Sequence, residues 1–284
     1  MSDAERPEQS QAEPGTTAAM DPEPDDRMEG YVGRDLLAGK RALVTGGDSG
    51  IGRAVAVAFA KEGADVAVAY LSEHDDARRT AELVEAEGRR CATIPGDLSE
   101  EAACRAAVET TVAELGGLDV LVNNIAHQKP VDSPAELTTE DWERTFRTNV
   151  HSYFWCTRAA LEHLPDGAAI VNSGSVNGLR GNGSLIAYAT TKGAVHVFTY
   201  SMAQALLDRG IRVNCVAPGP VWTPLIPATL PPGKTASFGQ QAPMERVAQP
   251  DEIAPSYVFL AADRLSSYYT GQVLTPVGGE THPG

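Results

Sequence analysis

The feature that most constrains this chain is an alternation of short apolar runs with longer amphipathic segments between residues 40 and 276. Such alternation requires right-handed crossovers between parallel strands. The short runs are apolar throughout, as expected for strands that helices cover on both faces. We therefore predict a single α/β domain with a doubly wound, seven-stranded parallel sheet. The expected strands are 41–45, 65–70, 91–94, 119–122, 168–172, 211–216 and 272–276, and the expected helices are 51–62, 74–87, 100–115, 142–164, 187–207 and 251–262.

A glycine-rich turn separates the first expected strand from the first expected helix. It reads Thr45-Gly46-Gly47-Asp48-Ser49-Gly50-Ile51-Gly52. Backbone amides at a helix N-terminus attract phosphate, and glycine lets a diphosphate approach the backbone closely. The turn therefore predicts a dinucleotide site in a Rossmann fold, formed by Gly46 and residues 48–52. Its spacing is G-x-x-x-G-x-G rather than the commoner G-x-G-x-x-G, and an ordinary tight turn is the alternative.

Other polar positions lie at the ends of expected strands, where ligands of doubly wound sheets bind. Asp97 follows the third strand and can accept a hydrogen bond from an adenine amino group, with a turn or helix cap as the alternative. Asn123 ends the fourth strand, where turn formation is the alternative. The second strand ends in Tyr70-Leu71-Ser72-Glu73, and we expect Tyr70, Leu71 and Ser72 to contact the cofactor. Neither an acidic group, which would favour NAD, nor a basic one, which would favour NADP, lies directly at that strand end. Both cofactors stay open, and the missing carboxylate favours NADP.

A tyrosine and a lysine four residues apart, Tyr188 and Lys192, lie in a long expected helix. Residues at this spacing share a helix face. A free tyrosine has a pKa of about 10, and a neighbouring ammonium lowers it. Ser175, after the fifth strand, can hydrogen-bond a substrate oxygen. Asn149, inside the preceding helix, can hold a water that relays protons to Lys192. A chance surface pair and an ordinary loop serine are the alternatives, but the combination at one sheet edge favours hydride transfer with Tyr188 handling the proton.

These motifs, in this order, resemble the short-chain dehydrogenase/reductase family from residue 40 to about residue 279. Thr45-Gly46 with Gly50-Ile51-Gly52 resembles the family's cofactor motif, and Asp97-Leu98 its adenine-contact motif. The catalytic tetrad of the family is matched by Asn149, Ser175, Tyr188 and Lys192. The N-terminal extension is similar to that of a subgroup of bacterial stress-associated and glucose-dehydrogenase-like oxidoreductases.

The resemblance implies further roles along the chain. Residues 224–250 would form a substrate lid, and helices 142–164 and 188–207 would form the interface of a homotetramer. Tyr188 and Lys192 would also bind the cofactor. The segment that receives the nicotinamide carboxamide would include Pro218, Gly219, Val221 and Thr223.

The expected reaction is the NAD(P)-dependent interconversion of an alcohol (a sugar, a polyol or a small alcohol) and its carbonyl. Together with Ser175, we expect Gln128, Asn177 and Trp222 to border the substrate, whose identity the sequence leaves open. A cofactor-binding sensor without turnover is the alternative from another class, and the same fold can host epimerases and dehydratases. Where the family usually has Asn-Asn-Ala-Gly, this chain has Asn123-Asn124-Ile125-Ala126. We expect a slightly altered loop there, because alanine adopts positive φ less easily than glycine.

Composition restricts the partners of the chain. A net charge of −15 argues against a nucleic-acid partner, and no apolar run reaches the ~20 residues that a membrane-spanning helix needs. Four scattered cysteines without a CxxC pair indicate buried thiols in a cytoplasmic protein, and no metal site is expected. Residues 1–30 are rich in Pro, Glu and Asp and poor in large apolar groups. We expect them to form a disordered or extended arm, followed by an oxidoreductase domain at residues 31–284.

Overall fold

The computed structural model describes residues 6–281 and contains a seven-stranded sheet whose strand pairs are all parallel. The strand order is β3-β2-β1-β4-β5-β6-β7, which confirms the predicted fold class. The order reverses between β1 and β4, and this reversal opens a crevice at the carboxyl ends of the strands. The strands are β1 (Arg41–Thr45), β2 (Asp65–Tyr70), β3 (Cys91–Pro95), β4 (Val120–Asn123), β5 (Ala169–Ser173), β6 (Arg212–Val216) and β7 (Val273–Leu274).

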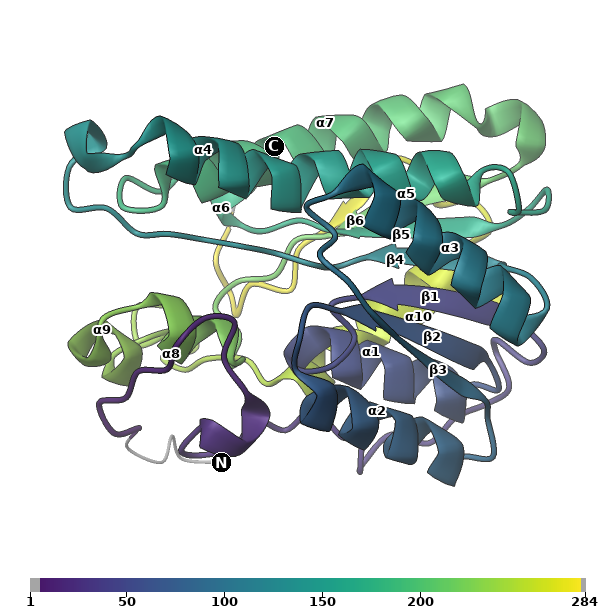
Figure 1. Ribbon diagram of the computed structural model, residues 1–284, viewed down its shortest axis with the longest axis horizontal. Coiled ribbons are helices and arrows are strands. Elements are labelled where there is room, and N and C mark those ends of the chain that lie inside the picture. Colours follow the sequence, from purple (N-terminus) through teal and green to yellow (C-terminus); the bar gives the residue numbers. More distant parts are fainter. Residues whose placement is uncertain (1–5, 282–284) are drawn as a thin grey trace.

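Helices cover both faces of the sheet (Figure 1). One layer consists of α1 (Gly50–Lys61), α2 (His74–Ala86) and α10 (Pro250–Ala261), and the other of α3 (Glu101–Leu115), α4 (Thr139–Phe146), α5 (Ser152–Ala160) and α7 (Ile186–Ala205). Neighbouring side chains of β1 pack on opposite faces of the sheet. Val44 packs in the core beside α1 and α10, and Leu43 packs in the core beside α3 and α5. Both side chains are fully buried, which explains the continuous apolar runs.

Several short helices lie in the connections. They are α6 (Asn177–Arg180), α8 (Leu225–Thr229), α9 (Pro232–Ala236), α11 (Asp263–Ser266) and the 3₁₀ turns η1 (Thr17–Ala19), η2 (Pro134–Glu136) and η4 (Leu207–Arg209). The long helix predicted at 142–164 is interrupted by a π-helix, η3 (Arg147–His151), between α4 and α5. There the Ser152 amide donates to the Arg147 carbonyl, five residues back. Such widened turns often lie at functional sites, and this one contains the buried Asn149.

Residues 6–30 do not hang free of the domain, as the prediction of a disordered or extended arm allowed. The segment contains η1 and otherwise follows an irregular path over α8 and α1 (Figure 1). Met20 and Met28 are buried against the domain, and the Met28 amide donates to the Asp251 carboxylate at 2.9 Å. The composition of the segment underestimates these contacts, because each one is made with a distant part of the chain. Residues 1–5 of the predicted arm lie outside the described residues.

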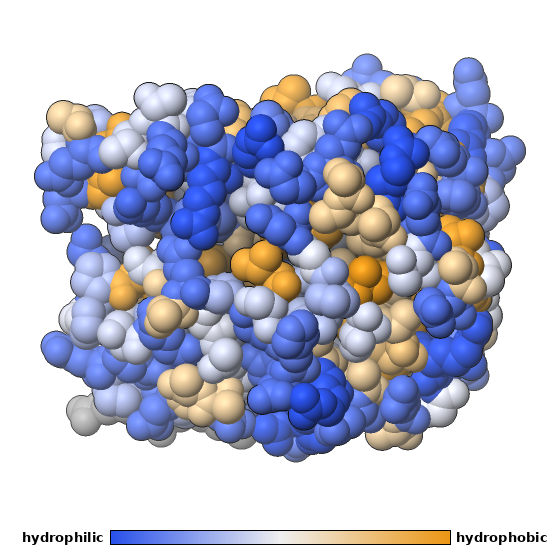
Figure 2. Space-filling view, viewed as in Figure 1, coloured by the Kyte–Doolittle hydropathy of each residue, from blue (hydrophilic) through white to orange (hydrophobic). Residues whose placement is uncertain are grey.

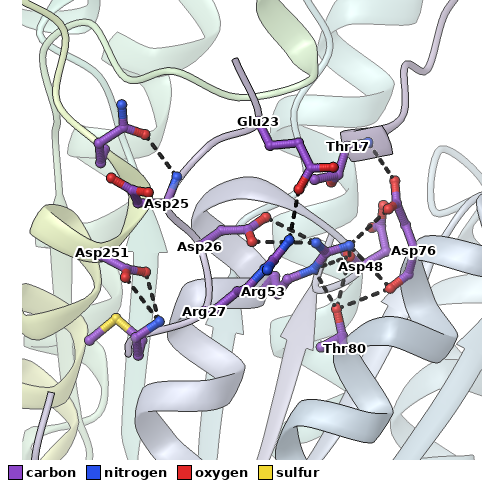
Figure 3. Close-up of polar contacts among 12 residues, drawn as sticks. Thr17, Glu23, Asp25, Asp26, Arg27, Asp48, Arg53, Asp76, Thr80 and Asp251 are labelled. Carbon is purple, nitrogen blue, oxygen red and sulfur yellow. Dashed lines mark hydrogen bonds and ion pairs between the residues drawn. The ribbon is translucent and has the colours of Figure 1, made fainter. Parts of the chain in front are cut away.

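A buried ion cluster ties this segment to the glycine-rich turn (Figure 3). Arg53 lies directly after Gly52, and its guanidinium pairs with Asp26 at 3.2 Å and Asp76 at 2.8 Å. The same guanidinium donates to the Asp48 carbonyl at 2.7 Å. Burial raises the pKa of Asp26 to about 6 even though Arg53 opposes this shift. Arg53 therefore connects the N-terminal segment, α2 and the turn at a site that water does not reach.

Replacing Arg53 tests this connection. An Arg53→Met variant leaves Asp26 and Asp76 buried without their cation, and we expect its free energy of unfolding to fall by about 3–5 kcal/mol. Urea unfolding followed by circular dichroism measures the change. Arg79→Met is the matched control, because Arg79 pairs with Glu82 on the exposed face of α2, and its loss is expected to cost under about 1 kcal/mol. Equal stability of the two variants would contradict the role assigned to Arg53.

Candidate functional site

A cavity of about 800 Å³ opens at the carboxyl edge of the sheet. Figure 2 shows a hollow between the upper helical layer and the part below it, with apolar side chains inside and hydrophilic ones around its rim. This volume is in the range of small-molecule and cofactor sites. The predicted site residues that line it are Gly46, Asp48, Ser49, Gly50, Ile51, Tyr70, Leu71, Asp97, Gln128, Ser175, Asn177, Tyr188, Lys192, Pro218, Gly219, Val221 and Thr223.

The glycine-rich turn brings backbone amides to the floor of this cavity. Gly46 and Gly50 have φ values of 63° and 51°, which favour glycine. A Cβ on Gly52 would lie 1.8 Å from the Gly46 carbonyl oxygen, so this residue lets α1 pack against the end of β1 and does not itself line the cavity. The first turn of α1 carries no acidic side chain. Its unneutralised amides and close backbone approach fit a diphosphate group.

The side of the cavity next to β2 is acidic. Asp48, Glu73 and Asp97 line it, and burial raises the pKa of Asp48 to about 6. One oxygen of Asp97 accepts the Ser99 amide at 2.9 Å, so the turn interpretation of this residue is confirmed for that oxygen. Two predicted cofactor-contact residues, Ser72 and Leu98, do not line the cavity. The Ser72 hydroxyl donates to Glu73 at 2.6 Å and lies outside the lining, and Leu98 is buried in the core beside α3.

Tyr188 and Lys192 lie together on α7, next to the end of β5. The Lys192 Nζ lies 5.6 Å from the centroid of the Tyr188 ring and donates to the Ser173 carbonyl at 2.7 Å. Burial lowers the pKa of Lys192 to about 8. Burial also raises the pKa of Tyr188, and a hydrogen bond with Ser175 acts in the opposite direction. The expected net lowering of the tyrosine pKa is therefore not found in the protein alone, where burial has the largest effect.

Asn149 is fully buried in the π-helix, and its side-chain amide is occupied. Its Oδ1 accepts the His127 amide at 2.7 Å. Its Nδ2 donates to the His127 carbonyl at 2.8 Å and to the Thr191 hydroxyl at 3.0 Å. The predicted water-holding role of this side chain is therefore not what the geometry favours. Asn149 instead fixes the loop after β4 to the residue that precedes Lys192.

Two other predicted positions lie away from the cavity. Asn123 donates to the Asn172 side chain at 2.9 Å and joins β4 to β5 inside the sheet. Trp222 is fully buried, and its indole donates to the Pro22 carbonyl at 2.8 Å. Trp222 therefore does not line the cavity, contrary to the expected place beside the substrate, because its indole is buried against the N-terminal segment.

Sequence reasoning missed several lining residues, namely Glu13, Pro14, Gly15, His127 and Arg144. The Glu13 Oε2 lies 2.9 Å from the Arg144 Nη2 and 3.5 Å from the His127 Nδ1. Arg144 is 131 positions further along the chain, so no local spacing pointed to this contact. The loop after β4 also avoids the problem expected at Ala126, because that residue does not have a positive φ.

The chain is similar to known proteins over most of its length. A family model described as enoyl-(acyl carrier protein) reductase matches residues 46–281. General stress protein 39 of Bacillus subtilis is 54% identical over 97% of this chain and 96% of its own. The NADPH-dependent aldehyde reductase 1, chloroplastic, of Arabidopsis thaliana is 46% identical over 97% of this chain and 98% of its own. The crystal structure of a short chain dehydrogenase from Burkholderia cenocepacia in complex with NADP superposes with a TM-score of 0.80 at 35% identity, over 86% of this chain and 98% of that one.

The occupied amide of Asn149 makes a prediction about stability. Asn149→Ala leaves the buried His127 amide and carbonyl without partners, and we expect the free energy of unfolding to fall by about 2–3 kcal/mol. Urea unfolding measures this loss. Asn177→Ala is the control, since among residues 6–281 the Asn177 side chain only accepts a 3.4 Å hydrogen bond from Asn182. An Asn149→Ala variant as stable as the Asn177→Ala control would contradict this structural role of Asn149.

Proposed function

Because the chain belongs to the short-chain dehydrogenase/reductase family, we propose that this oxidoreductase interconverts an alcohol and its carbonyl. The observation that carries the proposal is that Ser175, Tyr188 and Lys192 line the same cavity as the glycine-rich turn. A dinucleotide held at that turn would extend toward the three side chains, along the crevice of the sheet. The substrate class covers sugars, polyols and small alcohols.

The proposed mechanism assigns one task to each side chain. A bound nicotinamide ring supplies a hydride in reduction and accepts one in oxidation. In reduction, Tyr188 donates its hydroxyl proton to the carbonyl oxygen, on which negative charge develops. Ser175 donates a hydrogen bond to the same oxygen, and the Lys192 ammonium stabilises the phenolate that remains. Oxidation reverses these steps, and Asn149 acts as a positioning residue for the loop and for α7.

For the cofactor we propose NADP or NAD, with NADP favoured. The similar Burkholderia cenocepacia enzyme was solved with NADP, and the Arabidopsis thaliana relative is named NADPH-dependent. In this chain, Gly46, Ser49 and Gly50 would receive the diphosphate, and Tyr70, Leu71 and Asp97 would surround the adenosine. Residues 218–223 would receive the nicotinamide carboxamide.

Further proposals concern the lid, the domain, the oligomer and the location of the protein. We propose that residues 224–250 act as the substrate lid and that residues 31–284 form the catalytic domain. A homotetramer would use α4, α5 and α7, where Phe154, Val197 and Tyr200 expose apolar surface. Within residues 6–281, each helix is too short or too polar to cross a bilayer. The four cysteines are free thiols, which supports a cytoplasmic location.

Tyr188→Phe tests the proposed mechanism. The variant keeps the ring but loses the proton that it donates, so we expect kcat to fall by about 10²–10⁴-fold. Nicotinamide absorbance with a panel of carbonyls measures turnover, and fluorescence titration is expected to show unchanged cofactor binding. Tyr268→Phe, at an exposed ring outside the cavity lining, is expected to retain full activity. Near wild-type activity of Tyr188→Phe across the panel would refute the mechanism.

The acidic side of the cavity next to β2 predicts that removing a carboxylate there changes the preference between NADPH and NADH. Glu73 would lie near the 2′-phosphate that distinguishes NADPH from NADH, so Glu73→Gln removes a repulsion. We expect the ratio of NADPH to NADH affinity to rise about threefold to tenfold, with a smaller effect at high salt. Fluorescence titration with both cofactors measures the ratio. Glu82→Gln, on α2, which begins directly after Glu73, lies outside the cavity lining and is expected to leave the ratio unchanged. A shift of Glu73→Gln toward NADH would contradict the placement of Glu73.

A further inference from the structure

Residues 11–15 cross the mouth of the cavity. On one side they lie against the start of the lid: the Gln11 amide donates to the Pro227 carbonyl at 2.8 Å. Gly15 has a φ of +81°, and a Cβ there would lie 2.7 Å from the Pro224 carbonyl oxygen. On the other side, the Glu13 carboxylate reaches Arg144 on α4. The N-terminal segment therefore bridges α8 and α4 and forms part of the wall of the cavity that contains Tyr188.

The ion pair between Glu13 and Arg144 leaves some of its polar atoms without a partner among residues 6–281. Only Oε2 of Glu13 contacts Arg144 and His127, and Oε1 has no hydrogen-bond partner among residues 6–281. Within the same range, Arg144 donates from Nη2 alone, which leaves its Nε and Nη1 groups available. The side chains of Glu13 and Arg144 keep 33% and 57% of their exposure. A free carboxylate oxygen beside free guanidinium N–H groups offers an acceptor and donors at one place.

The charges of the pair limit what can bind there. Glu13 repels carboxylates and phosphates, and Arg144 repels amines, while the two charges together largely cancel. A neutral hydroxyl group can donate to Glu13 and accept from Arg144, which makes a hydroxylated carbon chain the best match. The nearby Gln128 side chain is held by the Thr229 hydroxyl of the lid at 2.7 Å, so this part of the wall is also polar.

We propose that Glu13 and Arg144 form a hydroxyl-binding subsite, and that the substrate is a neutral polyhydroxylated carbonyl or the corresponding polyol. The proposal rests on the proposed function, because the subsite would bind the end of the chain remote from the reacting carbon. The N-terminal segment is then a specificity-determining part of the enzyme.

Matched substrates test the subsite. Initial rates are compared for four- to six-carbon aldoses and for unsubstituted alkanals of the same length, using full-length protein and saturating cofactor. A lost hydrogen bond is worth about tenfold, so we expect Glu13→Ala to lower the aldose-to-alkanal ratio of kcat/KM by about that factor. Rates with alkanals are expected to change by less than about twofold. Glu23→Ala is the control: Glu23 lies in the same segment and pairs with Arg27, but it does not line the cavity.

Equilibrium binding separates this inference from the proposed function. Xylitol does not react with the reduced cofactor, so its binding to NADPH-loaded protein can be followed by NADPH fluorescence. We expect Glu13→Ala to weaken it about tenfold and Glu23→Ala to leave it unchanged. Glu13-dependent xylitol binding without turnover of any carbonyl would refute the proposed function and support the subsite. Turnover with an unchanged aldose preference in Glu13→Ala would refute the subsite alone, as would a Glu13→Ala variant that has lost only NADPH affinity.

Discussion

The pairing of β1 with both β2 and β4 is the constraint on which the rest of the structure depends. Leu43 of β1 lies in register with Ala67 on one side and Leu121 on the other. The chain leaves β1 and β4 toward opposite helical layers, so the loops after these strands diverge and the crevice opens between them. The Asn124 side chain locks the two strand ends together, donating to the Thr45 and Gly46 carbonyls at 3.1 and 3.0 Å. The glycine-rich turn and the catalytic candidates share one cavity because this junction is fixed.

Features that depend on residues close together in the sequence could be predicted from it. Apolar runs that alternate with amphipathic segments predicted the sheet, since burial of the strands on both faces leaves continuous apolar runs in the sequence. The spacing of Tyr188 and Lys192 predicted their shared face, because a helix fixes it. Side chains at strand ends were less predictable. Asn123 turns into the sheet and Leu98 into the core, and their direction depends on neighbours that sequence spacing does not specify.

The N-terminal segment shows why composition alone does not predict the contacts of residues 6–30. Composition counts large apolar groups, but this segment is held by specific polar contacts with distant residues. Asp26 meets a buried guanidinium, and Pro22 accepts from an indole 200 positions away. A buried carboxylate is costly unless it is paired, so Asp26 can be buried only where Arg53 is already held by Asp76 and the Asp48 carbonyl. The packing of the segment therefore depends on the surface of the domain that it contacts, and not on its own composition.

The cost of burying a charge also bears on Lys192, whose ammonium is buried among neutral oxygens. A buried ammonium usually pairs with a carboxylate, yet within residues 6–281 Lys192 forms no ion pair and contacts the neutral oxygens of Ser173 and Tyr153. A carboxylate partner would stabilise the ammonium but would also cancel its field at Tyr188. Neutral oxygens satisfy the N–H groups and leave the charge uncompensated. Its pKa of about 8 keeps the side chain mostly protonated at neutral pH, so the field is available to any negative charge that develops on the tyrosine. The desolvation that makes this lysine costly to bury also makes its charge effective over 5.6 Å.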